Sequence, residues 1–149
     1  MNTNFVFLTP AFNCEKEIKR TLFSMISQSY DNWRAVFIDD VSDDQTGQVI
    51  EDIAKSLDLG GRVKVIRREE KFGETRNTLE EIKEIDDSEV VCRLDGGDWL
   101  TENDTLFFMD EIYRKYNPKT GIMAPQMVKE MMEKMGKEDS IGYTADNGI

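Results

Sequence analysis

The sequence contains no histidine, and this absence narrows the chemistry open to the protein. Catalytic triads built on histidine, histidine general bases and histidine metal ligands are all excluded. Any catalytic or binding chemistry must therefore come from carboxylates, lysine, tyrosine and backbone groups.

Cysteine is also scarce, with only Cys14 and Cys92 present and no CxxC pair. Two such residues form neither a disulfide framework nor a zinc-ligand set, so we interpret both as reduced packing residues of a cytoplasmic protein. Residues 1–4 are polar and lead directly into an apolar segment. Neither a signal peptide nor a membrane-spanning helix is expected from this pattern.

Basic residues are outnumbered, 19 against 30 acidic ones, and the net charge is −11. This charge argues against non-specific binding to nucleic acid or to an anionic membrane surface. A polyanionic ligand would need a divalent cation held by carboxylates, or a local basic cluster. The candidate cluster is Arg67, Arg68, Lys71 and Arg76, and the alternative is that these residues form an ordinary solvated surface.

Short apolar segments alternate with amphipathic ones along the chain. Strands are expected at residues 4–8, 34–38, 62–67 and 89–95, the first of them ending before Thr9 and Pro10. Helices are expected between them, the third burying Leu79, Ile82 and Ile85, and a fourth begins at Thr101. Because the strands begin roughly 26 to 30 residues apart, we expect right-handed crossovers and a mostly parallel α/β sheet flanked by helices.

The periodic signal weakens beyond Pro118. With 149 residues, one domain is expected, and residues 1–118 are its expected core. Residues 119–149 are expected to form a short C-terminal extension, part helical, with a flexible tail.

Residues 93–100 form the most informative stretch, because two carboxylates, Asp95 and Asp98, follow an expected buried strand and are separated by two glycines. Ligands of open α/β sheets bind at this end of the strands. The oxygens of paired aspartates can there coordinate a hard cation such as Mn²⁺ or Mg²⁺ and accept hydrogen bonds from sugar hydroxyls. The alternative is a tight Asp-Gly turn in which the aspartates cap backbone amides.

Two other strand ends also carry polar residues, and together with residues 93–100 they resemble family 2 glycosyltransferases of the Rossmann-like GT-A fold. Four motifs carry the resemblance over about residues 4–118: Pro10-Ala11-Phe12-Asn13; Asp39-Asp40-Val41-Ser42-Asp43-Asp44-Gln45-Thr46; Gly73-Glu74-Thr75-Arg76-Asn77; and Asp95-Gly96-Gly97-Asp98. Gln28, Tyr30 and Trp33 also stand where the family often has Gln-x-Tyr and an aromatic residue.

The resemblance implies a nucleotide-sugar site, whose expected nucleotide-binding residues are Thr9, Pro10, Ala11, Asn13, Glu15, Asp39, Arg76 and Asp95. By this resemblance Asp39 accepts a hydrogen bond from the base, Arg76 faces the diphosphate and Asp95 binds the ribose side. Helix capping is the alternative for Asn13 at the first helix, and for Asp39, Asp40 and Ser42 at the second. An ion pair with Glu80, one helical turn away, is the alternative for Arg76.

The sequence departs from the family in two places. Gly97 stands where the family usually has its metal-binding aspartate, so Asp98 is the expected metal ligand for Mn²⁺ or Mg²⁺. About 30 residues follow Pro118, whereas family members continue with an acceptor-binding half that holds the catalytic base. No motif selects a base among the candidates Glu130, Glu133, Glu138, Asp139 and Asp146.

The sequence therefore predicts an inverting glycosyltransferase that transfers a sugar from a nucleotide-diphosphate sugar to a glycan, lipid or protein acceptor. An oligomer or a partner could supply the acceptor side. The alternative is a catalytically impaired nucleotide-sugar-binding or scaffold module. A nucleotidyltransferase is disfavoured, because the loop after the first strand contains neither glycine nor a basic residue.

Overall fold

A computed structural model describes residues 2–116 and residue 133. Strands and helices alternate along the chain, in the order β1 (Asn4–Ala11), α1 (Ile18–Ile26), β2 (Trp33–Asp39), α2 (Thr46–Ser56), β3 (Val63–Arg67), α3 (Glu74–Ile82), β4 (Glu89–Arg93) and α4 (Thr105–Tyr116). The predicted α/β class is confirmed. Apart from residue 133, the extension expected over residues 119–149 lies outside the described residues. None of the described helices is long and apolar enough to cross a membrane.

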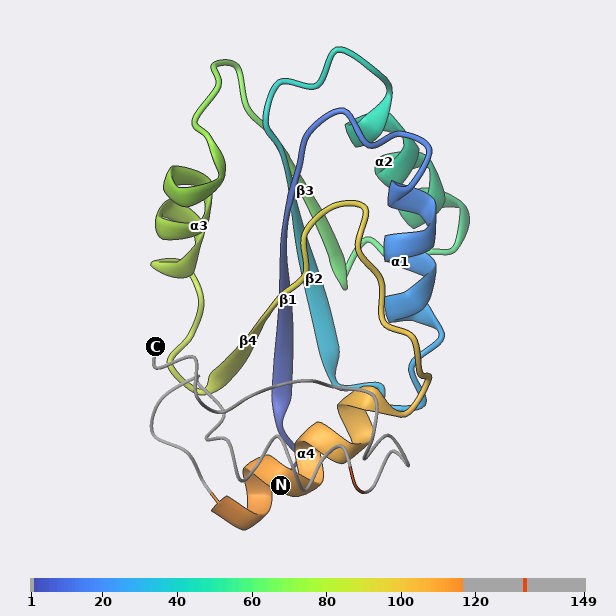
Figure 1. Cartoon of the computed structure of the whole chain (residues 1–149), viewed down its shortest axis with the longest axis vertical. Coiled ribbons are helices and arrows are strands. Elements are labelled where there is room, and N and C mark those ends of the chain that lie inside the picture. Colours follow the sequence, from blue (N-terminus) through green and yellow to red (C-terminus); the bar gives the residue numbers. More distant parts are fainter. Residues whose placement is uncertain (1, 117–132, 134–149) are drawn as a thin grey trace.

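The four strands form one parallel sheet in the order β3-β2-β1-β4. Helices α1 and α2 cover one face, α3 covers the other, and α4 lies across the ends where the strands begin (Figure 1). All the loops that leave the carboxyl ends of the strands therefore start at the same edge of the sheet, as the crossover rule predicts.

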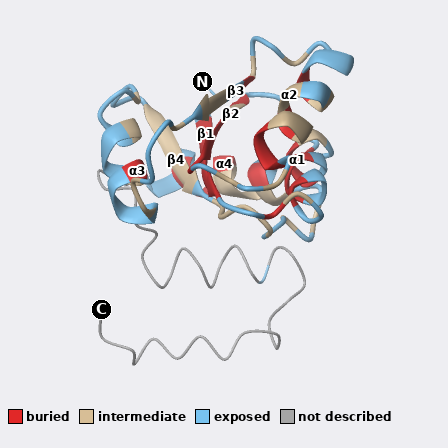
Figure 2. Cartoon of the chain, turned by 90° about the horizontal axis from the view of Figure 1, so that it is seen from above, coloured by how far each residue is buried: buried red, intermediate tan, exposed pale blue. Residues whose placement is uncertain are grey.

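Strand β1 is central and is buried along almost its whole length. Phe5 and Phe7 point into the larger core beneath α1 and α2, and the alternate residues Val6 and Leu8 join a smaller core on the α3 side. Figure 2 shows the buried residues concentrated in the central strands and on the inner side of α1. Apolar side chains on both faces of β1 thus fix its place in the middle of the sheet.

Strand β1 was predicted to end before Thr9. It continues instead through Pro10 to Ala11. Its pairing with β4 ends at Leu8, whereas its pairing with β2 runs on to Ala11. Pro10 therefore lies where one side of β1 is no longer part of the ladder, a position at which the missing proline N–H costs nothing. The longer strand places Pro10 and Ala11, both buried, at the carboxyl end of the central strands.

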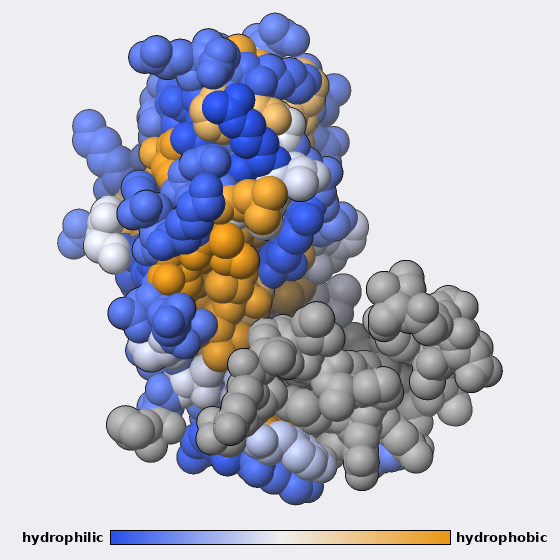
Figure 3. Space-filling view, turned by 90° about the vertical axis from the view of Figure 1, so that its left-hand side faces the viewer, coloured by the Kyte–Doolittle hydropathy of each residue, from blue (hydrophilic) through white to orange (hydrophobic). Residues whose placement is uncertain are grey.

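Helix α3 packs differently from the prediction. Leu79 and Ile82 are 55% and 43% exposed, and only Ile85, just beyond the helix, packs against the sheet. Figure 3, in which this side faces the viewer, shows apolar side chains gathered on the surface. The inward side of α3 is polar instead, because Arg68 bonds to both Asn77 Oδ1 and Glu81 Oε1.

Candidate functional site

The loops after β1, β2 and β4 meet at the carboxyl edge of the sheet, above the central strands (Figure 1). Direct backbone bonds tie them to one another: the Asp40 amide donates to the Ala11 carbonyl and the Gly96 amide to the Pro10 carbonyl. The sequence expectation that these strand ends would converge is thereby confirmed in the geometry of the sheet.

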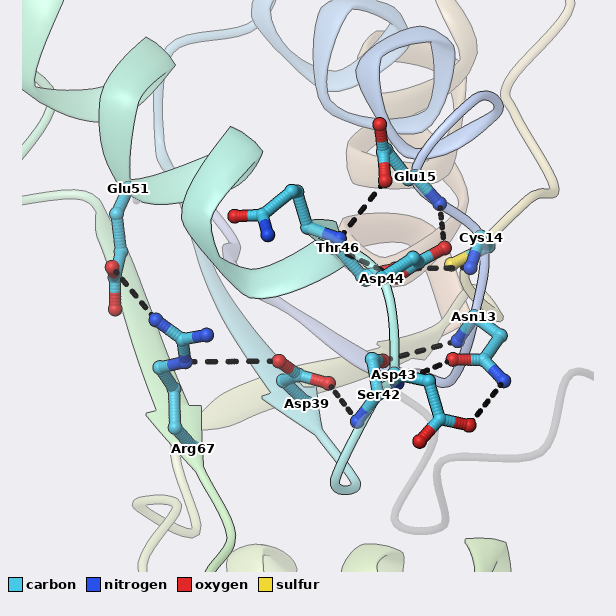
Figure 4. A network of polar contacts seen from close by, with 11 residues as sticks. Asn13, Cys14, Glu15, Asp39, Ser42, Asp43, Asp44, Thr46, Glu51 and Arg67 are labelled. Carbon is cyan, nitrogen blue, oxygen red and sulfur yellow. Dashed lines mark hydrogen bonds and ion pairs between the residues drawn. The ribbon is translucent and has the colours of Figure 1, made fainter.

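Asn13 links the first loop to the second (Figure 4). Its backbone N–H donates to Ser42 Oγ at 3.0 Å, and its side-chain Oδ1 accepts from the Asp43 amide at 2.7 Å. The residue has a φ of 48°, a left-handed conformation that asparagine tolerates better than most residues. Helix α1 begins later, at Ile18, so Asn13 and Ser42 hold the two loops together and do not cap α1 or α2.

Glu15 and Asp44 form a reciprocal pair next to this contact. The Glu15 amide donates to Asp44 Oδ2 at 3.0 Å, and the Gln45 amide donates to Glu15 Oε2 at 2.9 Å. The Thr46 hydroxyl and backbone amides bond to the Asp44 carboxylate and lower its pKa from the usual value. Glu15 therefore lies at the junction of the two loops, with one carboxylate oxygen already engaged.

Asp39 ends β2 and is only 4% exposed. Its Oδ1 accepts from the Ser42 amide at 3.1 Å, and its Oδ2 lies 3.7 Å from Arg67 Nε. Gly47, in the first turn of α2, leaves room for this carboxylate, because a Cβ there would lie 2.5 Å from Asp39 Oδ2. Asp39 is thus fixed on the α2 side of the edge.

Asp40 points the other way, toward α3. Its two carboxylate oxygens accept from the amides of Phe72 and Gly73, each at 2.8 Å, and so hold the entry into α3. Burial raises the pKa of the Asp40 carboxyl, but hydrogen bonds from Phe72, Asn77 and Gly73 outweigh this effect, and the pKa is lowered overall. This role was not predicted; the doublet of aspartates at the strand end was its only sequence signal.

A pocket of about 200 Å³ opens between the ends of β1 and β4 and the start of α3. It is lined by Pro10, Ala11, Phe12, Asp40, Glu74, Asn77, Asp95 and Gly96. Three of the predicted nucleotide-binding residues, Pro10, Ala11 and Asp95, line it together. Sequence reasoning did not assign Asn77 to this pocket, although it follows the arginine of the third motif.

Five of the eight predicted nucleotide-binding residues do not line this pocket: Asn13, Glu15 and Asp39, which bond at the junction of the first two loops, and Thr9 and Arg76. Thr9 is completely buried, and within the described residues its hydroxyl has no hydrogen-bond partner. Arg76 lies on α3 with its guanidinium 3.6 Å from the centre of the Phe72 ring and 4.0 Å from Glu70. The alternative pairing of Arg76 with Glu80 is wrong, because Glu80 pairs with Lys83 instead.

The carboxylates of the fourth motif lie in the loop after β4. Asp95 accepts from Arg93 Nε at 2.9 Å, and Arg93 also pairs with Glu74 of α3. Asp98 is exposed, and Gly97 before it has a φ of 104°, which favours glycine. Within the part of the chain that the structure describes, no three acidic or cysteine side chains form a ready-made metal cluster. One or two carboxylates nevertheless suit Mg²⁺ or Mn²⁺ where substrate phosphates complete the coordination.

Several known proteins are similar to this chain in sequence and in fold. The poly-β-1,6-N-acetyl-D-glucosamine synthase of Staphylococcus epidermidis is 29% identical over 140 residues, which is 93% of this chain and 32% of that protein. A crystal structure of S. aureus TarS in complex with UDP-GlcNAc is 26% identical with a TM-score of 0.64, covering 77% of this chain and 32% of that one. The chain thus spans about a third of the length of these relatives.

A mannosyltransferase from Pyrobaculum calidifontis, solved with GDP-Man and Mn²⁺, shares the fold at 20% identity and a TM-score of 0.64, over 71% of this chain and 31% of that one. These similarities confirm the predicted GT-A fold. The sequence model of the family described as "Glycosyl transferase family 2" matches residues 6–117, which is more than half of the chain. The chain therefore belongs to glycosyl transferase family 2.

Proposed function

We propose that this chain binds a nucleotide-diphosphate sugar at the carboxyl edge of its sheet and forms the donor-binding part of an inverting glycosyltransferase. The observation that carries the proposal is the pocket in which Pro10, Ala11 and Asp95 lie together beside Asp40. UDP-GlcNAc is the first donor to test, because a relative was solved with it.

The pocket is lined by three acidic side chains, those of Asp40, Glu74 and Asp95, so a bound diphosphate needs a nearby cation. Asp95 offers a carboxylate to sugar hydroxyls, and its bond to Arg93 holds the side chain in place. Lys71 reaches over the ring of Phe12, which lines the same pocket, with its Nζ 3.3 Å from the ring centre. A local cation of this kind reduces the repulsion between a diphosphate and a protein with a net charge of −11.

Asp98, with Asp95 beside it, would hold a Mn²⁺ or Mg²⁺ ion whose remaining ligands come from the diphosphate and water. Such an ion, when bound, offsets the charge that develops on the leaving diphosphate. In the proposed reaction an acceptor hydroxyl oxygen bonds to the anomeric carbon while the bond from that carbon to the diphosphate oxygen breaks. The proton of the hydroxyl passes to a carboxylate base that we do not assign to a residue.

A second candidate function is a nucleotide-sugar-binding module without turnover. The observation that favours it is Gly97, which occupies the family's usual metal-aspartate position with a φ of 104°. Because side chains rarely adopt this conformation, replacing Gly97 with aspartate would strain the loop as well as add a carboxylate. Asp98 is therefore the better residue to change.

Release of UDP from UDP-GlcNAc in the presence of Mn²⁺ tests the proposal, using the unmodified chain, Asp98→Asn and the control Asp87→Asn. Asp87 is an exposed acid that precedes β4, at the amino ends of the strands and so away from the pocket. We expect release by the unmodified chain and the control, and a loss of at least tenfold in Asp98→Asn, as is typical when a metal-site residue is removed. UDP binding without release would favour the module, and neither binding nor release would contradict both.

A further inference from the structure

Two polar side chains on α1 and a third just past its end lie on one inward-facing side. Thr21, Ser24 and Gln28 are separated by three and four residues, the spacing that brings side chains onto the same face, with Gln28 just past the end of the helix. All three are buried, at 0%, 9% and 6% exposure. Buried polar groups are usually hydrogen-bonded, and within this segment Ser24 Oγ donates to the Thr21 carbonyl and Gln28 Nε2 to the Ser24 carbonyl.

Each of the three side chains accepts a backbone N–H from the segment that follows β4. Thr21 Oγ1 accepts from Gly97, Ser24 Oγ from Leu100, and Gln28 Oε1 from Leu106, each at 3.1 Å. Gln28 also donates to the Glu102 carbonyl at 2.8 Å. The row therefore follows the loop from the fourth motif to the first turn of α4. This helix was predicted to begin at Thr101 but begins at Thr105, and Gln28 caps it by accepting from the Leu106 amide.

Asp98 lies between two of these anchored amides. Its neighbour Gly97 is held by Thr21, and Leu100 is held by Ser24. Trp99, the residue between Asp98 and Leu100, lies under Arg20 of α1, with the guanidinium carbon 3.5 Å from the ring centre. The backbone on both sides of Asp98 is thus fixed against one helix, although the Asp98 side chain itself is exposed.

We propose that Thr21 is a positioning residue that sets where the Asp98 carboxylate stands, by holding the Gly97 amide. The inference rests on the proposed function, since Asp98 is the expected metal ligand there. In this chain the aspartate stands one residue beyond the family position, so its placement depends on how the backbone at Gly97 is held. Loss of the Thr21 hydroxyl would leave the Gly97 N–H without its partner and free the loop to move.

The test compares Thr21→Val, which keeps the shape of the side chain but removes its oxygen, with Thr21→Ser, which keeps the oxygen. Thr78→Val is the control, because among the described residues the Thr78 hydroxyl bonds within α3, to the Glu74 carbonyl. The readouts are hydrogen exchange of the Gly97 amide, and the affinity for UDP measured calorimetrically with and without Mn²⁺.

We expect Thr21→Val to speed exchange at Gly97 by about tenfold, the size of one lost hydrogen bond. It should weaken UDP binding in the presence of Mn²⁺ while leaving Mn²⁺-free binding unchanged, and Thr21→Ser should restore both properties. Unchanged exchange at Gly97, or equal weakening with and without Mn²⁺, would overturn the positioning role.

Failure of the proposed function gives a different result. If the unmodified chain binds no UDP under either condition, the donor site is wrong and the positioning role falls with it. The exchange rate at Gly97 then still reports whether Thr21 holds the loop, because that measurement needs no ligand. Exchange that speeds equally at core amides of β1 would mean global destabilisation and would also overturn the role.

Discussion

Gly96 lies so close to Ala11 that a Cβ added to Gly96 would stand 2.8 Å from the Ala11 Cβ and 3.0 Å from Cys14 Sγ. The Gly96 amide also donates to the Pro10 carbonyl at 2.9 Å. The loop after β4 therefore packs directly on the end of β1, and this contact forms one wall of the edge pocket.

Gly96→Ala should destabilise the protein by about 1–3 kcal/mol, because the new methyl group overpacks the contact with Ala11 and Cys14. Nucleotide affinity should fall as well, since the pocket wall must shift. Urea unfolding measures the first effect. Gly61→Ala is the matched control, with nothing within 4 Å of its added Cβ; equal stability of the two variants would contradict the close contact.

Gly47→Ala should displace the Asp39 carboxylate, because the added Cβ would lie 2.5 Å from Asp39 Oδ2 and 3.0 Å from Arg67 Nε. If Asp39 accepts a hydrogen bond from the base, the affinity for UDP should fall roughly tenfold, the size of one lost hydrogen bond. Calorimetric titration measures this change, with Gly60→Ala as a control in open space. An unchanged affinity of Gly47→Ala for UDP would show that Asp39 does not bind the base.

Asn13 allows the backbone and side-chain contributions of the loop junction to be separated. Asn13→Gly keeps the positive φ accessible and removes only the side-chain bonds to the amide and carboxylate of Asp43, whereas Asn13→Ala also strains the backbone. We expect Asn13→Ala to be less stable than Asn13→Gly by about 1 kcal/mol in urea unfolding. The reverse order would show that Asn13 does not hold a left-handed conformation in solution.

Tyr30 predicts how stability changes in alkaline solution. Burial, together with a hydrogen bond to Asp110, raises the pKa of its hydroxyl from 10.0 to about 12. A group whose folded pKa is raised stabilises fully below its unfolded pKa and loses that contribution as the pH rises toward the folded value. At pH 11 the loss is about 1.4 kcal/mol, the equivalent of one pKa unit.

Tyr30→Phe should therefore lose less stability than the unmodified chain when urea unfolding is compared at pH 8 and pH 11. Parallel pH dependence of Tyr30→Phe and the unmodified chain would contradict the raised pKa.

The regular part of this fold could be predicted from sequence because it depends on local patterns. The apolar strands and the spacing of apolar residues in the helices predicted the parallel sheet. The positions of the strand ends predicted that the loops at the carboxyl ends meet. The packing of α3 could not be predicted in this way. Its inward side is set by Arg68, which directly follows β3 and bonds to Asn77 and Glu81.

The site shows the same division. Local rules suggested helix capping for Asn13 and Ser42, but the two residues bond to each other's loops across 29 positions of sequence. Such contacts depend on the parallel pairing of β1 with β2, which brings the two loops side by side. Arg76 was expected at the diphosphate from its motif alone, and its stacking on Phe72 depends on how the β3–α3 loop folds.

Thermal unfolding of the unmodified chain with UDP, GDP and dTDP, each with and without Mn²⁺, tests the proposed donor site most directly. A nucleotide that binds only the folded chain adds about 2.7 kcal/mol of stability at 100 times its dissociation constant. We predict that one of the three nucleotides, with UDP expected first, raises the unfolding temperature and that Mn²⁺ increases the shift. An unfolding temperature unchanged by all three nucleotides, with or without Mn²⁺, would contradict a nucleotide-binding site at this edge of the sheet.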